Sequence, residues 1–428
     1  MKYFSTNRKS PVVTFREAML AGQPPDKGLY FPEQIPTLNF DLLREKSKTE
    51  IAFEVIRPYI GGEIEDEALF RICAETVNFD FPLVKIAENI SALELFHGAT
   101  LAFKDVGARF MSRCLRYFSR EKSEKAIVIV ATSGDTGGAV AAGFLGVEGV
   151  EVVILYPSGK VSKLQELQLT TLGENITALE VEGSFDDCQQ LAKNALADEE
   201  LKTRVFLTSA NSINIARWLP QQFYYFYALQ QWQEETLPVI SVPSGNFGNI
   251  CAGLLAHVSG LPARHFIAAC NANDVVPKFL QSGKLIEQLS VATLSNAMDV
   301  AKPSNFVRVL ELFGGDAKKL KAKMSAVSIS DDITSNTMRR VFSERGYVLD
   351  PHAAIGFYAL ENYLEKNKGE KGFFLATAHP AKFDSVMEIV GTFGETPEAV
   401  KDLFSRPKQS VEMPVNYEIL KEILLSKI

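Results

Sequence analysis

The segment "ELFHGATLAFKD", residues 94–105, places Lys104 at the end of an apolar, glycine-containing run. Asp105 and a predicted helix follow the lysine. Two interpretations are open from these residues alone. In the first, Lys104 is a surface lysine whose stem lies along apolar neighbours while its ammonium stays in water. In the second, burial lowers the pKa of the amine and makes it a nucleophile for carbonyl groups.

Two further segments share the pattern of a strand, a Ser-Gly-Asp/Asn loop and a helix: "IVIVATSGDTGGAV" and "VISVPSGNFGNICAG". Ligands of an open parallel sheet bind at the carboxyl ends of its strands, and the following helix offers unpaired amides to an anion. Each loop alone could be an ordinary helix cap, and neither contains GxxxxGK[ST] or GxGxxG. Together they predict anion binding by Ser133, Gly134, Asp135 and Thr136, and by Gly245, Asn246, Phe247, Gly248 and Asn249.

Polar side chains gather in two other segments. In "TSANSINIARWLPQQ", residues 208–222, a helix starting near Ser212 would place several hydrogen-bond donors in its first turn. The guanidinium of Arg217 could bind phosphate or carboxylate there. An N-cap with one surface arginine is the alternative there. In "FFLATAHPAKF", residues 373–383, a strand ends just before a threonine and a histidine, and the histidine could equally be a capping residue. The candidate residues of the two segments are Asn211, Ser212, Asn214, Arg217, Thr377 and His379.

The overall composition is that of a globular protein. The 428 residues are 46% hydrophobic and 23% charged, with a formal net charge of −7. This length predicts two or three domains, and the negative charge argues against nucleic acid as a partner. The five cysteines are scattered and no HExxH pattern occurs, so neither a disulfide framework nor a metal site is expected. No signal peptide or transmembrane run is found, which predicts a cytoplasmic protein without membrane association.

The elements that must position these residues alternate along the chain. Short apolar runs predict buried strands at 126–132, 150–157, 176–183, 205–210, 237–243, 265–271 and 372–378. Helical spacing occupies 137–146, 160–171, 185–196, 211–233, 247–259 and 351–366. Such alternation predicts an α/β fold with mostly parallel sheets flanked by helices. Residues 1–85 differ, with helical stretches and few strand runs, and form an expected N-terminal unit.

These segments, in this order, resemble the threonine synthase family, whose members are pyridoxal-phosphate enzymes of fold type II, the tryptophan synthase β-subunit group. The resemblance covers essentially the whole chain and favours the bacterial and fungal branch. It implies an N-terminal domain at 1–85, a large cofactor-binding domain at 86–125 and 236–428, and a small mobile substrate domain at 126–235. Two residues depart from the family pattern: Asn249 stands where Asp is frequent, and Ala99 where Pro is frequent.

The resemblance also implies roles for the candidate residues. Lys104 would form the Schiff base with pyridoxal 5'-phosphate, and Thr377 would meet the pyridine nitrogen. The loop 245–249 would hold the cofactor phosphate. The substrate's carboxylate and phosphate would be received by Ser133, Gly134, Asp135, Thr136, Asn211, Ser212 and Arg217, with Asn214 and Lys160 as weaker candidates.

The implied reaction converts O-phospho-L-homoserine and water to L-threonine and phosphate, with Lys104 as the base. Three alternatives remain open from the sequence. A phospho-lyase would give 2-oxobutyrate from the same substrate. Other fold type II enzymes, such as serine/threonine dehydratases or cysteine synthases, typically carry a different lysine motif. A catalytically silent protein would only bind pyridoxal phosphate. A monomer or a homodimer is expected.

Overall fold

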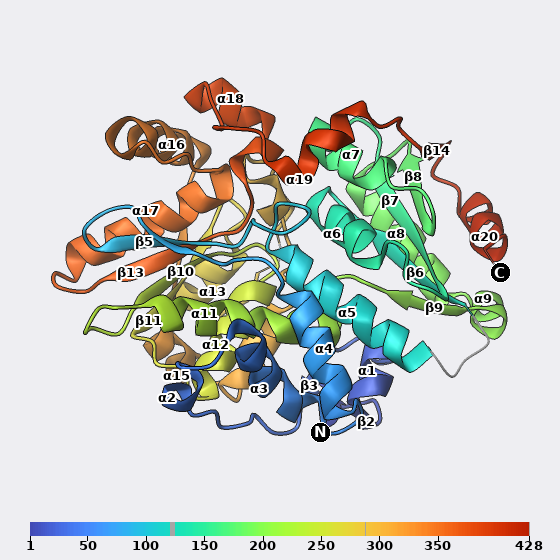
Figure 1. Ribbon diagram of the computed structural model, residues 1–428, viewed down its shortest axis with the longest axis horizontal. Coiled ribbons are helices and arrows are strands. Elements are labelled where there is room, and N and C mark those ends of the chain that lie inside the picture. Colours follow the sequence, from blue (N-terminus) through green and yellow to red (C-terminus); the bar gives the residue numbers. More distant parts are fainter. Residues whose placement is uncertain (120–124, 287, 428) are drawn as a thin grey trace.

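The computed structural model describes residues 1–119, 125–286 and 288–427. Two mostly parallel sheets, each flanked by helices, form the body of the protein (Figure 1). The larger sheet has the order β12-β11-β10-β13-β5-β4, made of Met324–Ser328, His265–Cys270, Val239–Pro243, Gly372–Ala376, Ile90–Glu94 and Leu83–Lys85. Only the pair β4–β5 is antiparallel in this sheet. The fold is therefore the expected α/β class.

The smaller sheet is parallel throughout and has the order β14-β8-β7-β6-β9. Its strands are Ser410–Met413, Ile176–Val181, Val150–Pro157, Ala126–Ala131 and Phe206–Ser209. The interior strand β6 is buried along its whole length, as expected for a parallel strand with helices on both faces. The associated helices are α6 (Asp135–Phe144), α7 (Lys163–Thr170), α8 (Phe185–Ala197), α9 (Glu199–Arg204) and α20 (Tyr417–Leu425).

The N-terminal unit contains more strand than the sequence predicts. Strands β1 (Lys2–Ser5), β2 (Val13–Thr14) and β3 (Tyr30–Pro32) form a small antiparallel sheet. These strands have two to four residues each, too short to give a clear alternating pattern. The helices of this unit are α1 (Phe15–Ala21), α2 (Phe40–Leu43), α3 (Lys48–Ile60) and α4 (Asp66–Thr76).

The remaining helices lie mainly around the larger sheet. They are α5 (Lys104–Ser119), α10 (Ile215–Trp218), α11 (Phe223–Gln231), α12 (Gly248–Val258), α13 (Val275–Ser282), α14 (Phe306–Leu312), α15 (Ala317–Lys323), α16 (Asp331–Arg345), α17 (Pro351–Lys366), α18 (Asp384–Val390) and α19 (Glu398–Lys401). Short 3₁₀ turns cover Leu219–Gln222 (η1), Asn296–Met298 (η2), Pro380–Lys382 (η3) and Asp402–Ser405 (η4). None of the helices in the described parts of the chain is long and apolar enough to span a bilayer.

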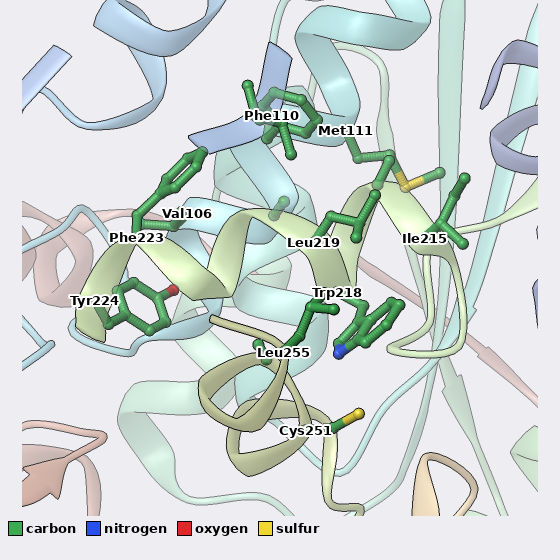
Figure 2. Packing of buried hydrophobic residues seen from close by; sticks show 14 of the residues in the cluster. Val106, Phe110, Met111, Ile215, Trp218, Leu219, Phe223, Tyr224, Cys251 and Leu255 are labelled. Carbon is green, nitrogen blue, oxygen red and sulfur yellow. The ribbon is translucent and has the colours of Figure 1, made fainter. Parts of the chain in front are cut away.

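A continuous apolar core joins α5, the 215–231 segment and α12 (Figure 2). Trp218 and Phe223 are fully buried there, next to Phe110 and Met111 of α5 and to Leu255 of α12. Burying side chains of this size stabilises a fold by about 1.5–3 kcal/mol each. The helix that begins with Lys104 is thus anchored along its length, so the amine is presented from a rigid element.

The C-terminal segment crosses between the two sheets. Sequence reasoning placed all of 236–428 in the larger unit, but β14 pairs with β8 at the edge of the smaller sheet. Helix α20 follows β14 and buries Leu420 and Leu424 in the apolar cluster of the smaller sheet. The end of the chain is therefore attached to the smaller sheet, which differs from the expected division. Residues 120–124, 287 and 428, which also fall in the expected larger unit, lie outside the described residues.

Candidate active site

Lys104 is placed by backbone pairing between two segments that are distant in the sequence. The Phe103 amide donates to the Thr377 carbonyl at 2.9 Å, and the His379 amide donates to the Leu101 carbonyl at 3.0 Å. Leu101 takes a left-handed conformation, with φ of 58°. The loop after β5 and the loop after β13 are therefore locked side by side, and Lys104 and Thr377 share one edge of the larger sheet.

The environment of Lys104 corresponds to the second interpretation, a desolvated amine. Its side chain is 19% exposed, and Nζ lies 3.7 Å from Oδ2 of Asp135. Burial lowers the pKa of Lys104 below its usual value, and the charges of Lys382 and Arg217 act in the same direction. The Asp135 carboxylate opposes this shift. A lysine held in this way reaches its neutral, nucleophilic form more readily than a lysine in water.

Asp135 faces lysines rather than an open substrate site. The Lys382 ammonium lies 2.8 Å from Oδ1, and the Gln165 amide donates to the same oxygen at 3.0 Å. Burial raises the pKa of this carboxyl, but the two lysines dominate and hold the pKa far below its usual range. A carboxylate offers no donor to a substrate anion and repels it. We therefore infer that Asp135 pairs with the two lysines and does not bind the substrate, in contrast to the expectation from the sequence.

The other residues of the first loop remain available to a ligand. Thr132, at the end of β6, accepts hydrogen bonds from the Gly134 and Gly137 amides at 3.0 and 2.8 Å, so it fixes the start of α6. Gly134 has φ of 132°, and a Cβ atom there would lie 2.4 Å from the Gln165 side chain. Ser133 and Thr136 are half-buried at this turn.

The second loop forms a concave backbone turn at the start of α12. Gly245 permits it, since a Cβ atom there would lie 2.5 Å from Cα of Met298. Phe247 is in the left-handed conformation, with φ of 62°, directly before the helix. The Asn246 side chain donates to Oγ of Ser212 at 2.6 Å and accepts from the Ser304 amide at 2.6 Å. The loop is therefore rigid and exposes the first amides of α12.

Two buried side-chain amides at this helix start have no partner among the described residues. The Nδ2 atoms of Asn249 and Asn305 are both unpaired, although Oδ1 of Asn249 accepts from the Tyr225 hydroxyl at 2.8 Å. A Cβ atom on Gly248 would lie 3.4 Å from Nδ2 of Asn305. Buried donors are normally satisfied, so unpaired ones point to a missing acceptor. With the helix dipole, they fit the phosphate of the expected cofactor.

The 208–222 segment differs from the sequence expectation. The helix begins at Ile215 rather than near Ser212, because Asn214 is the N-cap and accepts from the Ala216 amide at 3.0 Å. The Asn214 amide also donates to the Met19 carbonyl at 2.8 Å. Both ends of this buried side chain are thus used inside the protein, which removes Asn214 from the substrate-facing set. Asn211 and Ser212 are half-buried in the preceding turn.

Arg217 is buried close to Lys104 rather than exposed. Its guanidinium donates to the Ala210 carbonyl, while Nε has no partner among the described residues. Burial lowers the pKa of Arg217 to about 10, so the group stays charged at neutral pH. An unpaired N–H on a buried cation is suited to an anionic group of a substrate.

Sequence reasoning missed three residues of the site: Gln165, Asn305 and Lys382. Lys382 lies inside the segment 373–383, which carried part of the family resemblance, but no role was assigned to it. Lys382 has a local signal similar to that of Lys104, since it follows apolar residues shortly after a strand and precedes a helix. Its side chain is fully buried. For Gln165 the local signal indicates only a helix capping box, which it does form with Ser162.

A cavity of about 620 Å³ opens beside this edge of the larger sheet. Leu101 and His379 contribute to its wall, and Glu94 accepts there from the Tyr347 hydroxyl at 2.8 Å. Burial lowers the pKa of His379 to about 4, so the imidazole is neutral at physiological pH. Further carboxylates in this wall would repel a phosphate. The geometry therefore favours the α6 and α12 helix starts for anions. No cluster of three His, Cys, Asp or Glu side chains that could hold a metal occurs in the described ranges.

Comparison with protein families divides the chain into three matching parts. Residues 2–77 match "Threonine synthase N terminus", residues 84–377 match "Pyridoxal-phosphate dependent enzyme", and residues 353–424 match "Threonine synthase, C-terminal". The central match contains every candidate residue described above except His379 and Lys382, which lie in the C-terminal match.

Curated relatives and solved structures match over the full chain. Threonine synthases of Serratia marcescens and Escherichia coli are 44% and 43% identical, covering 99% and 100% of both chains in each pair. The crystal structure of the Escherichia coli enzyme superposes with a TM-score of 0.92 at 42% identity, covering both chains fully. A pyridoxal-phosphate-bound threonine synthase from Brucella melitensis gives a TM-score of 0.93 at 37% identity, covering 100% of this chain and 99% of that one.

Proposed function

This chain belongs to the threonine synthase family of pyridoxal-phosphate-dependent enzymes, and on that premise we propose that it converts O-phospho-L-homoserine and water to L-threonine and phosphate. The observation that carries the proposal is the combination of a shielded amine, Lys104, with unpaired donors at the start of α12. The first suits covalent capture of an aldehyde, and the second suits a phosphate.

Bound pyridoxal phosphate supplies the electron sink that carbanion chemistry requires. We assign its aldehyde to Lys104 and its ring nitrogen to Thr377. A neutral hydroxyl stabilises a protonated ring nitrogen less than a carboxylate does, so the sink is mild. The cofactor phosphate is assigned to the α12 turn, formed by Gly245, Asn246, Phe247, Gly248, Asn249 and Asn305.

Lys104 is also the proposed base of the reaction. Burial lowers its pKa and so favours the neutral amine, which can remove the proton at the substrate Cα and later return it. Substrate anions are assigned to Arg217, whose buried Nε–H is unpaired, and to the hydroxyl and amide groups around the α6 start. Those groups are Ser133, Thr136, Asn211 and Ser212. Donors fixed in this way stabilise the departing phosphate without reorganisation.

The product decides between threonine synthase and phospho-lyase. Cofactor-loaded protein is given O-phospho-L-homoserine, and released phosphate, threonine and 2-oxobutyrate are measured in the same samples. One threonine per phosphate is expected. One 2-oxobutyrate per phosphate would replace the proposal with the lyase, and no phosphate release would refute the substrate.

We further propose a monomer or homodimer in the cytoplasm. All residues assigned to the site come from one chain, so a single copy contains a complete site. All five cysteines are buried free thiols, as is typical of a reducing compartment. Specific activity should therefore stay constant on dilution through the range in which any dimer dissociates.

A further inference from the structure

A second buried lysine lies one carboxylate away from Lys104. Lys382 ends the turn η3 with a fully buried side chain, and its ammonium contacts Oδ1 of Asp135 at 2.8 Å. It also donates to the Thr100 carbonyl at 2.7 Å. The other oxygen of Asp135 lies 3.7 Å from Nζ of Lys104. One carboxylate therefore lies between the two lysine nitrogens, and the shorter contact is to Lys382.

The same carboxylate connects the two sheets. Asp135 begins α6 of the smaller sheet, whereas Lys382 follows β13 of the larger one. Neutral hydrogen bonds reinforce this junction: the Ser162 hydroxyl donates to the Lys382 carbonyl at 2.7 Å, and the Gln168 amide donates to the Thr100 carbonyl at 3.0 Å. Lys382 thus sits where α6 and α7 meet the loop that leads into Lys104.

The charges around Lys104 determine what Lys382 does to it. The charged groups that act on the Lys104 amine are Asp135 from α6, Lys382 from η3 and Arg217 from α10. The neighbouring Asp105 carboxylate accepts from the Thr100 amide at 2.9 Å. Lys382 and Arg217 lower the pKa of Lys104, while Asp135 raises it. Removing the charge of Lys382 would leave Asp135 to pair with Lys104 alone. The loss of the positive charge of Lys382 and the undivided pairing of Asp135 with Lys104 would each stabilise the charged form of the Lys104 amine.

We propose that Lys382 is a positioning residue that engages Asp135 across the junction of the two sheets and thereby keeps Lys104 available as a neutral amine. This inference deepens the proposed function and rests on it for its catalytic meaning. The proton that Lys104 releases passes to solvent. Lys382 acts through Asp135 and by its own charge, without touching the substrate.

The test measures capture of pyridoxal phosphate by cofactor-free protein, followed by visible absorbance between pH 6 and 10. A carbon–nitrogen double bond forms between the aldehyde and Lys104, with release of one water, and the rate depends on the fraction of neutral amine. In Lys382→Met the rate near neutral pH should fall about tenfold, equivalent to a shift of one pH unit in its midpoint. Lys382→Arg retains the charge and should keep the midpoint of the unmodified protein.

Ser162→Ala is the matched control. It removes an uncharged bond to the Lys382 backbone at the same junction, so it should lower stability and leave the midpoint unchanged. If Lys382→Met does not fold, Lys382→Gln, which keeps a donor for the Thr100 carbonyl, should show the same upward shift. A folded Met or Gln variant with the midpoint of the unmodified protein would overturn the proposal. The assay contains no substrate, so a failure of the proposed function would appear separately in the product measurement.

Discussion

Lys104 begins α5 with most of its side chain shielded from water, next to Asp135 and close to two further cations. The balance at this position is between burial, which favours the neutral amine, and a single carboxylate, which favours the charged one. Burial prevails, since it is the largest influence on the pKa of Lys104, and Lys382, which contacts the same carboxylate, lowers that pKa further. The chemistry assigned to Lys104 therefore depends on a residue distant in the sequence.

Lys104→Ala should abolish covalent capture of the cofactor and its visible absorbance. Turnover should fall by about 10²–10⁴-fold or more, because both the nucleophile and the base are lost. Lys193→Ala, on the exposed face of α8, is the control and should behave as the unmodified protein. Turnover close to normal in Lys104→Ala would refute the assignment.

Asn305→Asp should weaken cofactor binding without weakening the fold. Oδ1 of Asn305 accepts from the buried guanidinium of Arg308 at 2.7 Å, and burial lowers the pKa of that arginine to about 9. A carboxylate would strengthen the contact with Arg308. It would also replace the unpaired donor beside the α12 turn with a negative charge, which repels the cofactor phosphate. We expect the dissociation constant of pyridoxal phosphate to rise about 10–100-fold, equivalent to about 1.4–2.8 kcal/mol.

Titration with pyridoxal phosphate measures that change, and thermal unfolding of the cofactor-free protein provides the control. Asn305→Asp should unfold at or above the temperature of the unmodified protein. Undiminished cofactor affinity in a folded Asn305→Asp variant would remove Asn305 from the phosphate site.

At the scale of elements, anion binding depends on how two helices begin. The start of α6 is fixed by Thr132, and the start of α12 follows a turn in which Phe247 has a positive φ. Both helices follow interior strands of their sheets, β6 and β10. These helix starts would bind anions through backbone amides rather than charged side chains, so anion binding there depends on the backbone conformation.

Gly245→Ala should distort the α12 turn. The added Cβ atom would lie 2.5 Å from a backbone atom of Met298, which cannot rotate away as a side chain could. We expect a loss of about 1–3 kcal/mol in the free energy of unfolding, together with weaker cofactor binding. Denaturant unfolding and cofactor titration measure the two effects.

Gly356→Ala is the control for that substitution. Gly356 lies inside α17, and the nearest atoms to its added Cβ would be side-chain atoms at 3.3–3.5 Å. Alanine favours helix, so the variant should be close to the unmodified protein in stability. Equal stability and cofactor affinity in Gly245→Ala and Gly356→Ala would show that the turn tolerates a side chain.

Across the whole molecule, the C-terminal end of the chain lies in the smaller sheet, although most of the C-terminal half surrounds the larger sheet. β14 extends the smaller sheet and α20 packs against α8, as the red helix beside the green strands of Figure 1 shows. The ion pair between Lys421 and Asp198, at 2.9 Å, adds a polar contact to this attachment. Any movement of the smaller sheet must therefore carry the C-terminus with it.

Leu420→Ala should test this attachment. The side chain is fully buried, so its truncation should cost about 2–5 kcal/mol. In amide hydrogen exchange, protection should fall in β8 and α8 of the smaller sheet and remain in β13 and α17. Val411→Ala, at a half-exposed position of β14, should change the stability by about 0.5 kcal/mol or less. Loss of protection confined to the larger sheet would contradict the observed pairing.

The amino-acid sequence alone predicts the α/β class, the strands β6–β11 and β13, the helices α6, α7, α8, α12 and α17, the lysine and the two glycine-containing loops. These features depend on apolar periodicity and on turn residues, which act over a few neighbouring positions. The short strands of the N-terminal unit and the start of α10 escaped it, because tertiary hydrogen bonds such as that of Asn214 to the Met19 carbonyl decide them.

The groups that surround Lys104 come from distant parts of the chain and are brought together by the packing of the two sheets. The sequence placed Asp135 with the substrate and assigned nothing to Lys382, because nothing near residue 135 reveals a lysine contributed from residue 382. The unpaired amides of Asn249 and Asn305 likewise become visible only when two distant segments meet. Burial and pairing of charges are long-range properties, so the local pattern supplies the reactive groups and the packed fold sets their protonation and their partners.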